Sequence, residues 1–286
     1  MTKQQKIAWI TGASSGLGAA TALRLVKEGW VIAATARSAD KIEVLIHHVE
    51  IFGGGGRIVN YPGDVTDAGQ MQEIVARIEA ELGPIDLALL NAGTYLPDTV
   101  ETFAAAHLQT QYETNVIGTA HCLEPVLKLF RARNKGHIAI VSSVAGYRGL
   151  PRSLSYGSSK AALINLAEAL AIELRGSKIK VQVVCPGFIK TPLTDKNDFY
   201  MPMLMDVDKA AEELVRGLNG GFFEISFPWI FSLLTKLVDL LPDRLYIWTI
   251  GKIKEKQWSM KNEQDRGSDS DSASADQSGD GPAKAA

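Results

Sequence analysis

Short apolar runs alternate with longer helical patterns along the first 220 residues, and this alternation limits the fold more than any other feature. The runs cover residues 6–12, 30–37, 56–65, 84–93, 136–143 and 179–187. They are nearly continuously apolar, which is typical of parallel strands buried on both faces of a sheet. Strand–helix alternation with short turns predicts one α/β domain, residues 1–221, built on a doubly wound parallel sheet.

The chain changes character after residue 221. Residues 222–258 are strongly apolar, and Ile230, Leu233 and Leu237 recur at helical spacing. Charged residues and two prolines interrupt the run, so we expect no membrane span. We expect this extension to pack on the domain or on a partner subunit. An apolar substrate lid, or peripheral membrane contact through 222–253, stays open.

The last stretch, residues 262–286, is rich in Ser, Asp, Gly and Ala and has no large apolar side chain. Such a segment buries too little apolar surface to offset the entropy of ordering, so it predicts a disordered tail.

Charge and cysteine content exclude several classes of protein. The formal net charge is -2, so no basic field points to nucleic acid. Cys122 and Cys185 are too few for a disulfide scaffold or a metal cluster, and no histidine falls in a metal-ligand spacing, so we expect no metal site. The N-terminal segment has no apolar run of signal-peptide length, which favours a cytoplasmic location.

A glycine-rich turn, "TGASSGLG" at 11–18, links the first apolar run to the first helical pattern. Gly12 permits a tight turn, Gly16 lets a pyrophosphate approach the backbone, and Gly18 allows close helix–sheet packing. The spacing differs from Gly-x-Gly-x-x-Gly, but the strand before and the helix after are the required context. The sequence predicts a dinucleotide site here.

The second apolar run indicates which dinucleotide. In NAD-binding sheets an acid at this strand end holds the ribose 2′-hydroxyl, but here Arg37 ends the run and no acid precedes it within the run. A guanidinium suits a 2′-phosphate by charge and by donor geometry. We therefore expect NADP(H) rather than NAD(H).

Two residues in "LSYGSSKAAL" at 154–163 suggest acid–base chemistry. Lys160 lies four residues after Tyr156, on the same face of a helix. A nearby ammonium favours a phenolate, so we expect the pKa of Tyr156 to be lowered toward neutrality. Ser143 ends the fifth apolar run, where a hydroxyl could donate to a substrate oxygen. Asn115 lies within a long helical pattern at 101–134, where asparagine is an unfavourable residue.

The ordered set of motifs resembles the short-chain dehydrogenase/reductase family, NADP-preferring type. It comprises the glycine turn, "NAG" at 91–93, Asn115, Ser143, "YGSSK" at 156–160 and "PG" at 186–187, and it covers about residues 5–220. The resemblance implies a Rossmann-like, mostly seven-stranded parallel sheet flanked by helices, a nicotinamide cofactor, and hydride transfer between a carbonyl and an alcohol.

The resemblance also implies roles for individual residues. Asn115, Ser143, Tyr156 and Lys160 would form the catalytic tetrad, with Asn115 holding a water that links Lys160 to solvent. The stretch from Phe188 to about Met205 would be the substrate loop. Cofactor contacts would come from Gly12, Ser14, Ser15, Gly16, Leu17, Gly18, Arg37, Asp64, Val65, Asn91, Ala92, Gly93, Tyr156, Lys160, Pro186, Gly187, Ile189 and Thr191.

Three functions fit this pattern. The first is an NADP(H)-dependent carbonyl reductase or alcohol dehydrogenase, whose substrate is hydrophobic because the 188–205 segment is rich in Met, Phe, Tyr and Leu. The second is a cofactor-binding sensor or scaffold without turnover. The third is an epimerase or dehydratase that uses the same site. We expect a homo-oligomer; substrate identity and reaction direction stay open.

Overall fold

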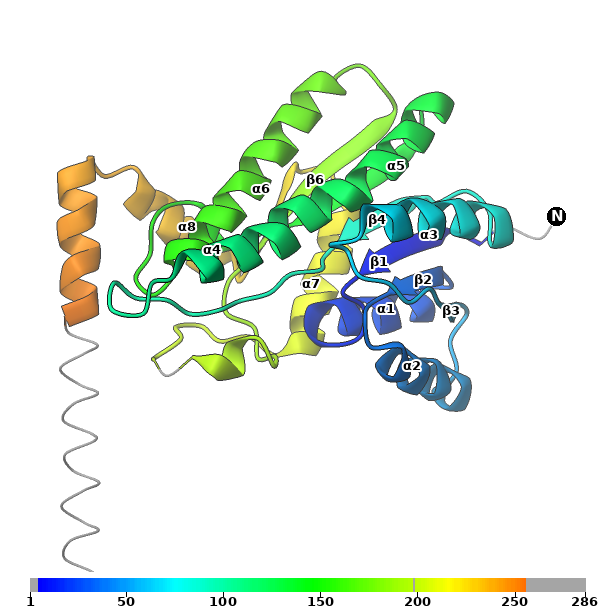
Figure 1. The fold of residues 1–286 in the computed structure, drawn as a ribbon, viewed down its shortest axis with the longest axis horizontal. Helices are drawn as coiled ribbons and strands as arrows, with labels where there is room; N and C mark the ends of the chain where they lie inside the picture. Colours follow the sequence, from blue (N-terminus) through cyan, green and yellow to red (C-terminus); the bar gives the residue numbers. More distant parts are fainter. Residues whose placement is uncertain (1–4, 198, 256–286) are drawn as a thin grey trace, which may run out of the picture. The chain divides into compact units, whose positions relative to one another are not determined.

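The computed structural model describes residues 5–197 and 199–255. Its centre is a seven-stranded sheet of order β3-β2-β1-β4-β5-β6-β7, in which each pair of neighbouring strands is parallel (Figure 1). The strands are β1 (Ile7–Thr11), β2 (Val31–Thr35), β3 (Arg57–Asn60), β4 (Leu87–Leu90), β5 (Gly136–Val141), β6 (Ile179–Pro186) and β7 (Glu224–Phe227). The predicted doubly wound parallel sheet is confirmed.

Helices cover both faces of this sheet (Figure 1). They are α1 (Gly16–Lys27), α2 (Ala39–Phe52), α3 (Ala68–Glu81), α4 (Ala105–Tyr112), α5 (Gly118–Arg133), α6 (Leu154–Glu173), α7 (Val207–Asn219) and α8 (Trp229–Asp239). Short turns of helix lie at η1 (Glu113–Ile117), η2 (Val144–Gly146) and η3 (Thr194–Lys196).

Alternate residues of each central strand feed two separate cores. In β1, Ala8 and Ile10 join the cluster under α1, α2 and α7, whereas Ile7 and Trp9 join the cluster under α3, α5 and α6. A strand buried on both faces has no polar face, which is why the apolar runs in the sequence are continuous.

The strand order reverses beside β1, which pairs with β2 on one side and β4 on the other. Crevices at the carboxyl ends of strands form at such a reversal, and ligands of doubly wound sheets bind there. The glycine turn, the "NAG" motif, Ser143 and the "PG" motif each follow or end one of β1, β4, β5 and β6. The topology therefore gathers the predicted site residues at one edge of the sheet.

The predicted domain boundary at residue 221 does not coincide with the structure. β7 lies beyond it and pairs with β6, and α8 packs on β7 with Ser232 buried. The compact unit built on the sheet runs to Leu240. The four residues of β7 lie within a longer apolar stretch, so their two-residue period could not be separated from the predicted extension. The outward side chains of α8 are exposed, Trp229 and Leu237 among them.

Of the described residues, 199–200 and 241–255 belong to a second unit, and within it residues 243–255 are helical. The whole of the predicted tail, 262–286, and the end of the predicted extension, 256–258, lie outside the described residues. Among the helices that the structure describes, none has the length and hydropathy to cross a membrane.

Candidate active site

The turn after β1 is held in a conformation that favours glycine. Gly12 and Gly16 have φ of 66° and 54°, in the left-handed region. A β-carbon added at Gly12 would lie 2.8 Å from the Cα of Ala92, and one at Gly18 would lie 2.4 Å from the carbonyl oxygen of Gly12. The turn is thus packed against the end of β4, and side chains are excluded where a phosphate would approach.

The helix that follows presents its N-terminus at this turn. Ser15 is the N-cap of α1 but makes no side-chain capping bond, and Leu17 is buried beneath. Backbone amides at a helix start carry partial positive charge and bind phosphates. This cradle fits a pyrophosphate, so the residues present agree with the dinucleotide that the turn predicts.

Neighbouring strand ends complete the cofactor side of the crevice. Arg37 is exposed just beyond β2 and forms no ion pair within the described part of the chain. Asp64 Oδ1 accepts bonds from the Thr66 amide and hydroxyl, which shapes the turn after β3, and Val65 is buried beside Gly118. An exposed guanidinium at this strand end fits a 2′-phosphate.

The "NAG" motif ties β4 to β1. The Asn91 side-chain amide donates to the Thr11 carbonyl at 3.0 Å, and the Thr11 hydroxyl accepts from the Asn91 and Ala92 amides. A β-carbon at Gly93 would lie 3.2 Å from Asn115 Oδ1 and 3.4 Å from Lys160 Nζ. Asn91 and Ala92 shape the crevice, and Gly93 leaves room for Asn115 and Lys160 to lie close to it.

Asn115 lies where the predicted long helix is interrupted. Instead of one helix over 101–134, α4 and α5 are joined by the π-helical turn η1, and Asn115 in it is completely buried. Its Oδ1 accepts from the Thr94 amide at 2.7 Å, and its Nδ2 donates to Ser159 Oγ at 3.0 Å. π-turns within helices often mark functional sites. Here the π-helical turn places the Asn115 side-chain amide between Thr94, in the loop after β4, and Ser159 of α6.

Ser143 lies between the end of β5 and α6, the helix that carries Tyr156 and Lys160. Its hydroxyl accepts from the Ala145 amide at 3.1 Å, donates to the Pro186 carbonyl at 3.4 Å, and hydrogen-bonds to the Tyr156 phenol. The residue is nearly buried, so this hydroxyl has a defined position. The tetrad that the sequence predicts is therefore assembled from η1, the end of β5 and α6.

The expected lowering of the Tyr156 pKa is wrong for this structure. The residue keeps some exposed surface, but its hydroxyl is surrounded by protein, and this burial raises the pKa from 10.0 to about 12. The Ser143 hydrogen bond opposes the rise without reversing it. Desolvation of the phenolate therefore outweighs the stabilisation that sequence spacing suggested.

The environment of Lys160 explains why its ammonium does not lower the pKa of Tyr156. Its Nζ lies 5.6 Å from the centre of the Tyr156 ring and donates to the Val141 carbonyl at 3.0 Å. Burial lowers the pKa of this ammonium from 10.5 to about 8, so the cation is itself destabilised. Helical spacing placed the two residues together, but it could not report how much water reaches them.

The segment after β6 returns to the phosphate turn. Pro186 accepts the Ser143 bond, the Gly187 amide donates to Phe227, and Ile189 is buried. The Thr191 side chain lies 3.3 Å from where a β-carbon of Gly16 would be. The last four predicted cofactor residues thus run from the tetrad to the cradle.

Three residues beside Tyr156 and Lys160 were not among the site residues predicted from the sequence. Tyr95 packs against Tyr156, Cys185 lies beside Tyr156 and Lys160, and Asp98 accepts hydrogen bonds from the Ser155 amide and hydroxyl. Tyr95 follows a strand end by five residues, so a search of strand ends could have found it. A lone acid such as Asp98 carries no pattern.

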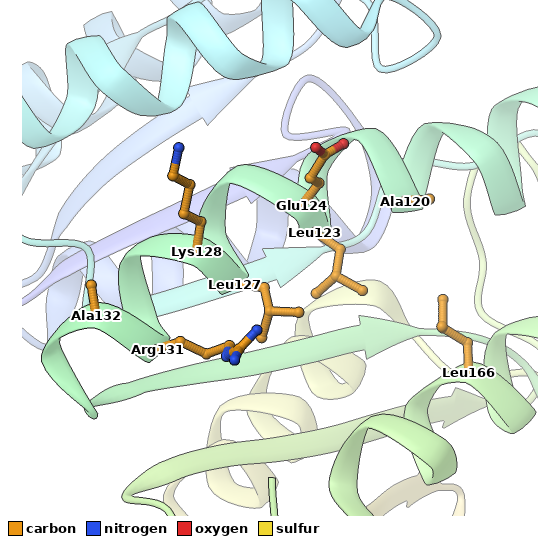
Figure 2. Close-up of a pocket in the computed structure, with 8 residues that line it drawn as sticks. All are labelled: Ala120, Leu123, Glu124, Leu127, Lys128, Arg131, Ala132 and Leu166. Carbon is orange, nitrogen blue, oxygen red and sulfur yellow. The ribbon is translucent and has the colours of Figure 1, made fainter. Parts of the chain in front are cut away.

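A groove on the outer surface of α5 and α6 lies apart from this site (Figure 2). None of the predicted site residues lines it, so the groove offers no support for a substrate site there. Its lining residues are Ala120, Leu123, Glu124, Leu127, Lys128, Arg131, Ala132 and Leu166. Among the described residues, no group of His, Cys, Asp or Glu side chains could hold a metal ion.

Comparison with known proteins agrees with this geometry. Residues 6–199 match the family model described as short chain dehydrogenase. An uncharacterised oxidoreductase of Myxococcus xanthus is 36% identical over 241 residues, which are 84% of this chain and 94% of the relative. A 3-oxoacyl-[acyl-carrier-protein] reductase of Thermotoga maritima is 33% identical over 196 residues, covering 68% and 79% of the two chains.

Solved structures show the same fold. ElxO with NADP bound has a TM-score of 0.69 and 28% identity, covering 79% of this chain and 99% of that one. The NADPH-bound actinorhodin polyketide ketoreductase has a TM-score of 0.71 and 25% identity, covering 79% and 97%.

Proposed function

Because the chain belongs to the short-chain dehydrogenase family, we propose that it is an NADP(H)-dependent oxidoreductase that reduces a carbonyl with Tyr156 as the proton donor. The observation that carries the proposal is the tetrad geometry. Asn115, Ser143, Tyr156 and Lys160 come from three elements and meet beside the crevice at the end of β4. When bound, the nicotinamide supplies the hydride that adds to the carbonyl carbon.

The raised pKa of Tyr156 favours reduction. A phenol whose pKa is about 12 is protonated at neutral pH, so its Oη holds the proton that a developing alkoxide needs. Oxidation needs the phenolate as proton acceptor, and burial keeps that form scarce at neutral pH. We therefore infer that the free protein holds Tyr156 in the protonation state that carbonyl reduction requires.

Ser143 and Lys160 support proton transfer from Tyr156, Ser143 by hydrogen bonding and Lys160 by replacing the proton. The Ser143 hydroxyl hydrogen-bonds to the phenol, and the same hydroxyl can stabilise the charge that forms on the substrate oxygen. Lys160 has a pKa near 8, so it is close to its titration point at physiological pH and suits replacement of the proton that Tyr156 gives away. Asn115 fixes the Thr94 backbone and Ser159, and so holds the space in which a water could reach Lys160.

NADP(H) is the cofactor that these residues fit. Arg37 is exposed at the end of β2, where the ribose 2′-position of a dinucleotide on this turn would lie. Two relatives of known structure, ElxO and the actinorhodin ketoreductase, hold NADP or NADPH.

The substrate we propose is hydrophobic. Ile189 and Met205 are buried at the base of the segment after β6, and Phe188 packs on Phe231 of α8 with ring centres 5.8 Å apart. The Tyr95 ring adds an apolar wall beside Tyr156. A long-chain or aromatic carbonyl would pack on the partly exposed Phe188 and on the Tyr95 ring.

A panel of aldehydes and ketones with NADPH tests the function, read by loss of the NADPH absorbance. Turnover of long-chain or aryl carbonyls, lost in Tyr156→Phe, is the expected result. Tight NADPH binding without turnover on the whole panel would instead favour a sensor or scaffold. Faster turnover of small polar ketones would contradict the hydrophobic pocket.

Two further proposals follow from the sequence alone. We infer a cytoplasmic location and a homo-oligomeric state for the full chain. Light scattering of the purified protein measures the second directly, and a monomer at micromolar concentration would contradict it.

A further inference from the structure

Two loops far apart in the sequence meet at the catalytic tyrosine. Tyr95, in the loop after β4, is 7% exposed, and its ring centre lies 4.9 Å from that of Tyr156. The planes are 70° apart, an edge-to-face arrangement that aromatic pairs favour. Tyr95 therefore covers one side of the residue that would give the proton.

The same tyrosine is hydrogen-bonded to the segment after β6. Its hydroxyl donates to Asn197 Oδ1 at 3.0 Å, and Lys196 Nζ donates to the Tyr95 carbonyl at 3.1 Å. Asn197 is held in turn, because its Nδ2 contacts Met201 Sδ at 3.3 Å. These bonds join positions about one hundred residues apart, so they fix the distance between the two loops.

The base of the segment is closed by separate bonds. The Lys190 amide donates to the Met205 carbonyl, and the Met205 amide donates to the Phe188 carbonyl, each at 2.9 Å. Thr194 Oγ1 donates to the Ile189 carbonyl at 2.6 Å. The backbone thus fixes where the segment leaves and rejoins the domain, whereas Tyr95 holds η3 and Asn197, which lie farther along it.

We propose that Tyr95 is a specificity-determining residue whose ring limits the pocket beside Tyr156 and whose hydroxyl holds the substrate segment in place through Asn197. This inference rests on the proposed carbonyl reduction. A carbonyl carbon carries two substituents, and the substituent nearest Tyr95 must be small, as in an aldehyde or a methyl ketone. The other substituent lies away from Tyr95 and can be long and apolar.

The ring and the hydroxyl are separable by mutation. Tyr95→Ala removes the ring and opens space next to Tyr156, so a ketone with two large substituents should gain access. We expect the ratio of kcat/KM for benzophenone to that for acetophenone to rise about tenfold or more relative to the wild-type protein. A ratio that stays within about twofold of the wild-type value would overturn the role of the ring.

The hydroxyl is tested by a double-mutant cycle. Tyr95→Phe and Asn197→Ala should each raise KM for acetophenone about two- to tenfold, the range of one net hydrogen bond, with kcat nearly unchanged. Tyr95→Phe removes only the shared bond and Asn197→Ala also removes the Met201 contact, so the double variant should match Asn197→Ala. Asn197→Asp, which keeps an acceptor oxygen, should restore KM toward the wild-type value. If the KM increases of the two single variants multiplied in the double variant, the Tyr95–Asn197 hydrogen bond would not be what holds the segment.

A matched control and a turnover-free measurement complete the experiment. Tyr61→Phe removes another buried tyrosine hydroxyl, one bonded to Glu81 on α3, and should leave KM and the substrate ratio unchanged. Hydrogen–deuterium exchange of residues 190–197 should become faster in Tyr95→Phe but not in Tyr61→Phe. Unchanged exchange would refute the tie even if the protein reduced no carbonyl, and in that case the absence of turnover would count against the proposed function instead.

Discussion

The turn after β1 presents backbone to a ligand, whereas the pocket around Tyr156 presents buried side chains. At the turn, Gly12 and Gly16 adopt left-handed φ angles, and a β-carbon at Gly12 would lie 2.8 Å from the backbone of β4's end. At the pocket, Asn115 and Lys160 are almost fully enclosed and make their bonds to carbonyls and hydroxyls.

The two regions differ in their energetic cost, which is backbone strain at the turn and desolvation of polar groups in the pocket. The turn needs a strained backbone path, which glycine adopts at low steric cost. The pocket needs polar groups to leave water, which displaces the pKa of Tyr156 upward and that of Lys160 downward. Substitutions at the turn should therefore change cofactor affinity, and substitutions in the pocket should change chemistry and its pH dependence.

Tyr156→Phe should have the largest effect. Loss of the proton donor is expected to lower kcat about a thousandfold while the NADPH Kd stays within about twofold, because the ring and its packing are kept. Steady-state rates and fluorescence titration with NADPH measure the two quantities. A variant that kept full activity would remove Tyr156 from the mechanism.

Lys160→Met should change stability with a defined pH dependence. The folded-state pKa of Lys160, about 8, lies below its ordinary value of 10.5. Between these values the unfolded chain holds a proton that the folded chain lacks, so the wild-type protein gains stability as pH rises from about 8 to 10.5 and loses it again as pH falls over the same range. Methionine has no such proton.

The stability of the wild-type protein relative to Lys160→Met should therefore rise by on the order of 3 kcal/mol between about pH 8 and pH 10.5. Urea unfolding at several pH values measures the difference. A gap between the two proteins that stays constant with pH would show that burial of the ammonium is not costly, and the contrast between the two regions would weaken.

Arg37→Ala tests the cofactor side. Loss of charge-assisted hydrogen bonds to a 2′-phosphate should weaken NADPH binding about 10- to 100-fold and leave NADH binding nearly unchanged. Kinetics with both cofactors gives the ratio. Equal losses for NADPH and NADH would mean that Arg37 does not contact the 2′-position.

Gly12→Ala should have the smallest effect of the four. The methyl group forces strain at a left-handed φ and crowds Ala92, so NADPH affinity should fall about tenfold. Gly53→Ala is the matched control, since Gly53 also has a left-handed φ, 78°, but nothing lies within 4 Å of its added carbon. If both variants bound NADPH alike, strain alone would explain the result.

Much of the fold was predictable because its signals are local. A continuous apolar run reports a strand buried on both faces, and the glycine turn reports a strand-to-helix corner that the structure contains. β7 was missed because its four residues, Glu224–Phe227, sit within an apolar stretch that continues into α8. The π-turn at Asn115 was missed because its residues continue a helical pattern.

The sequence predicted which residues would meet at the candidate site, but not how deeply they would be buried or in which direction the pKa of Tyr156 would change. Spacing placed Lys160 one helical turn from Tyr156, and the structure keeps that contact. The direction of the pKa change depended on Ser143, Tyr95 and Cys185, which reach Tyr156 from other elements. Because no periodicity in the sequence reports how those elements pack, the expected lowering could not be tested before the fold was known.

The sequence by itself predicted the strand–helix order, a turn that can accept a dinucleotide and, through the family resemblance, four candidate tetrad residues. These features depend on residue type and on spacing within one element or one turn. Only the tertiary structure decided that Tyr156 is a protonated acid rather than a ready base, and that Tyr95 joins two loops across it. Burial and cross-loop bonds sum over neighbours far apart in the chain, so they exist only once the sheet has brought the carboxyl ends of its strands together.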